Sequence, residues 1–109
     1  MPSNNFSKIL LAAVEESLSS LGESSKHAIF YHLENSFEIE KERIPENLTE
    51  FADALEKIFG LGASYLEKLI TQQLHEKLGL DLEDESHKSF LETMDSVRKR
   101  LEAEAEGIT

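Results

Sequence analysis

Four histidines are the side chains in this sequence best suited to bind a metal or to carry protons. They are His27, His32, His75 and His87. His27 and His32 are five positions apart, which places them about 140° apart around a helix, so they do not converge on one metal. No His-Glu-x-x-His motif is present, and no glutamate precedes a histidine by three residues as in diiron bundles. We therefore predict no metal-binding residues.

Motifs for covalent catalysis and for phosphate binding are missing as well. The chain has no cysteine, which excludes disulfides, thiolate zinc sites and cysteine nucleophiles. The serines between Ser17 and Ser25 lie in no Gly-x-Ser-x-Gly or Ser-x-x-Lys motif. Gly60-Leu61-Gly62 lacks the lysine and the hydroxyl residue of a phosphate loop. We predict no catalytic residue, no cofactor and no enzymatic activity.

Charge narrows the class of partner. The 109 residues include 22 acids and 11 bases, a formal net charge of −11. Such a chain is poorly suited to nucleic acid or to an anionic membrane, because both are bound through lysine and arginine. The apolar run from Ile9 to Val14 is too short to span a bilayer, and the N-terminus has no basic leader. We expect a cytoplasmic protein with a protein partner.

Helical periodicity dominates the rest of the sequence. Apolar residues recur at spacings of three and four, and only five glycines and two prolines interrupt them. The pattern predicts an all-α fold: a compact bundle of about five helices with a long C-terminal helix, in a single domain spanning residues 1–109. The predicted helices are approximately Asn5–Leu21, Ser25–Ser36, Leu48–Phe59, Ala63–Leu78 and Ser86–Glu106.

The connections between these helices carry further expectations. Ile39 and Ile44 should anchor an irregular connector to the core, with a helix boundary before Pro45. Asn47-Leu48-Thr49-Glu50 predicts a capping box at the start of the third helix. Gly60 should adopt a backbone angle that a Cβ atom would oppose, at a tight corner before the fourth helix.

The last predicted helix carries the candidate partner-binding residues. Phe90, Met94, Val97 and Leu101 step by four, three and four positions, close to the seam of a coiled coil. One interpretation is that this seam binds a protein partner or a second copy of the chain. The alternative, equally favoured by the pattern, is that the seam closes the chain's own bundle.

Two other groups of residues allow more than one interpretation. The basic triple Arg98-Lys99-Arg100 lies at helical spacing from Asp95 and the following glutamates, which predicts surface ion pairs, with a partner-binding basic edge as the alternative. Six of the eight aromatic residues are expected to pack in the core at helix-face positions, with a small apolar ligand pocket as the alternative. They are Phe30, Tyr31, Phe37, Phe51, Phe59 and Tyr65.

Three segments also resemble a known family. They are the helix Ala28-Ile29-Phe30-Tyr31-His32-Leu33-Glu34, the turn Ile44-Pro45-Glu46-Asn47, and Ile58-Phe59-Gly60 with Gly62-Ala63. In these packing and turn residues the stretch from Leu21 to Leu80 is similar to small archaeal helical domains, the Nitrosopumilus output domains. The resemblance implies a free-standing signal-output or adaptor domain without enzymatic activity, and it supplies no catalytic residues.

These observations together predict a non-enzymatic protein-interaction or regulatory module. In this hypothesis the module associates with a protein partner or with itself through the last helix. The competing hypothesis is a helical bundle that binds a small ligand or a metal, through an interhelical pocket or one of the histidines.

Overall fold

The structure is a computed structural model in which the backbone of residues 2–79 and 89–107 is described, with side chains for residues 6–79 and 89–103. These residues form five α-helices and two 3₁₀ helices, and no strand occurs among them. The all-α prediction is confirmed. The elements are α1 (Pro2–Ser19), α2 (Glu23–Phe37), η1 (Lys41–Glu46), α3 (Leu48–Phe59), η2 (Gly60–Gly62), α4 (Ala63–Leu78) and α5 (Phe90–Gly107).

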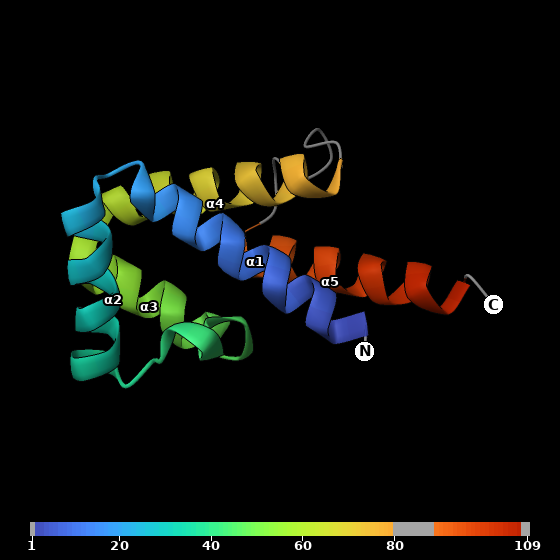
Figure 1. Ribbon diagram of the computed structural model, residues 1–109, viewed down its shortest axis with the longest axis horizontal. Coiled ribbons are helices and arrows are strands. Elements are labelled where there is room, and N and C mark those ends of the chain that lie inside the picture. Colours follow the sequence, from blue (N-terminus) through green and yellow to red (C-terminus); the bar gives the residue numbers. More distant parts are fainter. Residues whose placement is uncertain (1, 80–88, 108–109) are drawn as a thin grey trace.

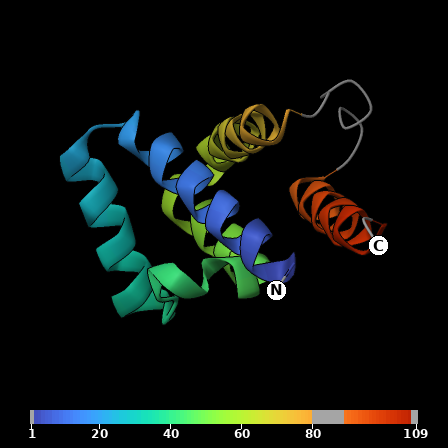
Figure 2. The ribbon, with the colours of Figure 1, turned by 45° about the vertical axis from the view of Figure 1, so that its right-hand side comes forward.

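Helix α1 is the centre of the packing. Its apolar face is buried along its length by Phe6, Leu10, Ala13, Val14 and Leu18. It packs most extensively against α4, which runs in roughly the opposite direction, and it also contacts α2, η1 and α5 (Figure 1). Figure 2 shows α1 between α2 on one side and α5 on the other. The core is therefore assembled around this one helix.

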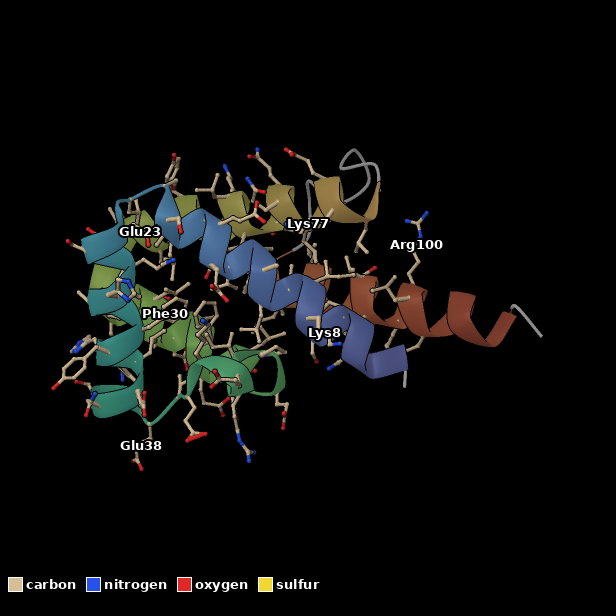
Figure 3. The ribbon with its side chains drawn as sticks, viewed as in Figure 1. Lys8, Glu23, Phe30, Glu38, Lys77 and Arg100 are labelled. Atoms are coloured by element: carbon tan, nitrogen blue, oxygen red, sulfur yellow. The ribbon has the colours of Figure 1, made fainter. Side chains whose placement is uncertain are left out.

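Two ion pairs connect distant segments to the C-terminal part of α1. Lys41 Nζ of η1 lies 3.1 Å from Glu15 Oε2 and 5.5 Å from the ring centre of Phe30 on α2. Glu16, the next residue of α1, accepts a hydrogen bond from Lys77 of α4 (Figure 3). Because these side chains are partly exposed, each pair contributes little free energy, about 1 kcal/mol at most. The buried apolar face supplies most of the stabilisation.

The C-terminal helix is a correction to the sequence prediction. Helix α5 has 18 residues, the same as α1, and the longest helical run is instead the central one from α3 through η2 into α4. Within the described residues α5 begins at Phe90, where Ser89 and Glu92 form a capping box. The Ser89 N–H donates to Glu92 Oε1 at 2.9 Å, and the Glu92 N–H donates to Ser89 Oγ at 3.1 Å. The predicted start at Ser86 lies outside the described residues.

The connector after α2 confirms one prediction and corrects another. Ile39 and Ile44 are both buried and anchor it to the core, as expected. Pro45, however, lies inside η1, and the predicted capping box at Asn47 does not form. The Asn47 side-chain amide donates to the Arg43 carbonyl at 3.0 Å, so it completes the end of η1 and leaves the start of α3 without a side-chain cap.

The corner between α3 and α4 depends on Gly60. Its φ of 59° and ψ of −126° lie in a region that side-chain-bearing residues rarely adopt, as the sequence predicted. The chain then makes the single turn η2 and enters α4 directly. This geometry carries Leu61, the middle residue of η2, out of the core into solvent.

One polar side chain on the buried face of α1 has no hydrogen-bond partner in the described part of the chain. The Ser17 hydroxyl is fully buried, and no hydrogen-bond partner for it is found among the described residues. A buried hydroxyl without a partner loses its hydrogen bonds to water on folding and regains none. The buried Ser17 hydroxyl therefore lowers the free energy of unfolding of the protein.

Replacing Ser17 with alanine should raise the free energy of unfolding by about 1–2 kcal/mol, because the unpaired hydroxyl disappears and alanine favours helix. Urea denaturation followed by circular dichroism measures the change. Ser20→Ala is the matched control: its hydroxyl donates to the Ser17 carbonyl at 2.6 Å. That variant should lose about 0.5–1 kcal/mol. A loss of stability in Ser17→Ala would show that the hydroxyl has a partner.

Candidate interaction surfaces

The four predicted partner-binding residues lie together on the inner face of α5. Met94 and Val97 are 1% and 2% exposed, and Phe90 and Leu101 are partly buried against the same core. Helix α5 contacts α1, α4 and α3. The four residues therefore pack into the chain's own bundle, as the alternative interpretation of the sequence expected. Partner binding through these residues stays a prediction, and it requires α5 to leave the core.

Asp95 forms ion pairs with two residues of the basic triple on α5, Arg98 and Lys99. Arg98 Nη2 lies 2.8 Å from Asp95 Oδ1, and Lys99 Nζ lies 3.2 Å from Oδ2. Hydrogen bonds from Arg98 and Lys99 lower the pKa of the Asp95 carboxyl, so it is a carboxylate at neutral pH. The predicted surface ion pairs of this segment are therefore present at Asp95.

A groove separates this side of α5 from the junction of η1 and α3. Its volume is about 260 Å³. Its lining combines the apolar residues Pro45, Leu48 and Leu91 with polar and charged ones, which are Glu46, Thr49, Glu50, Asp95 and Arg98. We call this feature the α3–α5 groove. No aromatic side chain lines it, so it differs from the aromatic-lined ligand pocket that the sequence left open as an alternative.

Two tyrosines that the sequence assigned to the core are exposed. Tyr31 is 70% exposed on α2 and Tyr65 is 63% exposed on α4, whereas Phe51 is buried as predicted. Tyr31 is two positions from both Ile29 and Leu33, the buried residues of α2, and so lies about 200° from each around the helix. A strict helical projection of the sequence would have placed this side chain in solvent.

Leu61 and Tyr65 form an exposed apolar surface that the sequence analysis missed. Leu61 in η2 is 98% exposed, and Tyr65, four positions later in the first turn of α4, is 63% exposed. We call these two residues the corner patch. The α3–α4 corner lies at the same end of the molecule as the α1–α2 connection, away from both termini (Figure 1), and that connection holds the partly exposed Leu21.

The histidines do not gather into a site within the part of the chain described. His75 is buried, and its Nδ1 lies 2.8 Å from the Thr71 carbonyl oxygen of its own helix. His27 and His32 are exposed on α2, and His87 lies outside the described residues. Among the residues that the structure describes, no group of three or more potential metal ligands comes together.

Two acids on neighbouring helices, Glu67 of α4 and Glu56 of α3, interact electrostatically. Glu67 on α4 is partly buried, and its pKa is raised first by burial and then by the charge of Glu56 on α3. The folded state therefore holds the Glu67 proton more tightly than the unfolded chain does. The stability from this group is present below its ordinary pKa of 4.5 and is lost as the pH rises through the higher folded value.

Glu67→Gln should therefore stabilise the protein at neutral pH, with a gain that disappears below about pH 4, where both states are protonated. Urea denaturation across this pH range measures the difference from the original protein. NMR titration of the carboxyl group adds a second test: Glu56→Gln should lower the pKa of Glu67, whereas Glu50→Gln, an exposed acid at the other end of α3, should not. Equal effects of the two variants would contradict the assigned cause.

Comparisons with known proteins add no relative. No protein-family model, curated protein or solved structure matches this chain. The similarity to the Nitrosopumilus output domains stays a prediction from the sequence. In the described part of the chain, no helix combines the length and the apolar character needed to cross a membrane.

Proposed function

We propose that this chain is a non-enzymatic protein-interaction module that serves a regulatory or adaptor role, and that it binds a protein partner through the corner patch. The observation that carries the proposal is the 98% exposure of Leu61. A protein surface that removed this side chain from water would gain about 1.5–3 kcal/mol from it alone. The sequence supports the non-enzymatic assignment through its lack of catalytic motifs.

The backbone around the corner patch favours binding. The backbone of Leu61 is held between α3 and α4 by the Gly60 turn, so little backbone freedom remains to be lost when a partner covers this residue. Tyr65 adds an aromatic ring with a polar tip, a side chain that is enriched at interfaces. Tyrosine is also enriched among the few residues that dominate binding energy at interfaces.

The predicted self-association through α5 is a separate form of the same proposal. In this form the apolar face of α5 leaves the chain's own core and packs against the same face of a second copy. The residues of this face are Phe90, Met94, Val97 and Leu101. Because Met94 and Val97 are almost fully buried, the exchange must break the contacts of α5 with α1 and α4. The corner patch carries no such cost, and for this reason we favour it as the contact surface.

The proposal predicts that Leu61→Asp and Tyr65→Ser each abolish partner binding without unfolding the protein. Affinity capture from the source cells, quantified against the original chain, measures the loss, and circular dichroism checks the fold. Tyr31→Ser is the matched control, because Tyr31 is equally exposed but lies on α2. The proposal fails if Leu61→Asp retains the partners of the original chain, or if Tyr31→Ser loses them too.

A further inference from the structure

The two glycines that flank Leu61 differ in what the fold requires of them. Gly60 has a φ of 59° and a ψ of −126°, angles that favour glycine, and it sets the corner. Gly62 has a φ of −69° and a ψ of −14°, which other residues adopt readily in a helical turn. Within the described residues, a Cβ atom at Gly62 would meet one atom, the Cβ of Phe59 at 3.6 Å, an ordinary van der Waals contact. The fold therefore supplies no conformational or steric reason for a glycine at position 62.

Glycine at position 62 is also unfavourable for stability. It leaves the unfolded chain more conformational freedom than alanine does, so a change from glycine to alanine at a position with such angles usually stabilises a protein. The two glycines leave the backbone on both sides of Leu61 without side chains. Because Leu61 is 98% exposed, it projects from this bare stretch of backbone. The absence of a side chain at Gly62 allows the surface of another molecule to approach the main chain closely.

The shape and the area of this feature restrict the partner. A projecting side chain is buried most completely by a concave surface, and a second copy would offer the same projection. Even at the 150–250 Å² that a large aromatic side chain buries, Leu61 and Tyr65 would bury at most about 500 Å² per copy. This area is below the roughly 800 Å² per partner of a stable interface. A pocket on a different protein, which also covers the flanking backbone, fits the corner patch better than a second copy does.

The charges around the corner balance, unlike those of the whole chain. Residues 55–69 contain two acids and two bases, whereas the full chain has a net charge of −11. The acids are Glu56 and Glu67, and the bases are Lys57 and Lys68. A partner that approaches the corner patch therefore meets no net charge. The acidic composition of the chain does not require a basic partner at this surface.

We propose that Leu61 inserts into a narrow apolar pocket of a partner protein, and that the rim of this pocket rests on the backbone of Gly60–Gly62. Tyr65 packs against the outside of the rim. The inference rests on the proposed function and deepens it, because it names the chemistry of the partner's surface and adds Gly62 to the contact. The pocket removes the leucine from water, and the bare backbone lets the rim come close.

Incorporation of photo-leucine at position 61 of the full chain, in extract of the source cells, identifies the partner and its contacting residues. We expect crosslinks to apolar residues of a protein other than this chain. Gly62→Ala should weaken binding of that protein, once purified, at least about tenfold, because a methyl group stands where rim and backbone meet. The same variant should melt at the original temperature or up to about 5 °C higher. Between about 0.1 and 1 M salt, the dissociation constant should change less than about twofold.

Ser64→Ala is the matched control, because Ser64 is exposed in the first turn of α4 but lies outside the glycine-flanked turn. It should bind the partner like the original chain. Unchanged binding by Gly62→Ala, a lower melting temperature of that variant, a strong salt dependence, or crosslinks to charged residues or to a second copy would each overturn the inference. The proposed function survives each of these results if Leu61→Asp loses the partner. The absence of any crosslinked protein would contradict the proposed function, and the inference with it.

Discussion

The packing of the other elements around α1 is the constraint on which the rest of the structure depends. Its buried face runs from Phe6 to Leu18 and meets α2, η1, α4 and α5. Ser17 shows how strongly this packing is favoured, because the core retains a buried hydroxyl that has no partner among the described residues. Apolar burial around one helix thus outweighs the cost of a single desolvated polar group.

This constraint decides which surfaces remain for function. Because α5 uses Met94 and Val97 to complete the core around α1, its outer side is left for contacts with other molecules. The corner patch and the α3–α5 groove both border α3, one at each end of that helix. The position of α3 in the bundle therefore fixes the separation of these two surface features.

The sequence predicted the elements well because periodicity and glycine positions are local properties. The corner at Gly60 and the buried anchors Ile39 and Ile44 follow from such properties. The destination of the α5 seam could not be predicted, since periodicity identifies residues that share a face but not what that face meets. The caps were not predicted correctly either. The Asn47 side chain bonds to the end of η1, and Ser89 and Glu92 form a capping box that the sequence analysis did not propose.

Native-state hydrogen–deuterium exchange of α5 tests the central claim most directly. If α5 closes the chain's own core, the amides from Met94 to Val97 should exchange as slowly as those from Leu10 to Val14 in α1. Their protection should also be the same in dilute and in concentrated protein. Fast exchange confined to α5, or protection that grows with protein concentration, would contradict the claim that α5 closes the chain's own core. Either result would favour binding of a partner by the apolar face of α5.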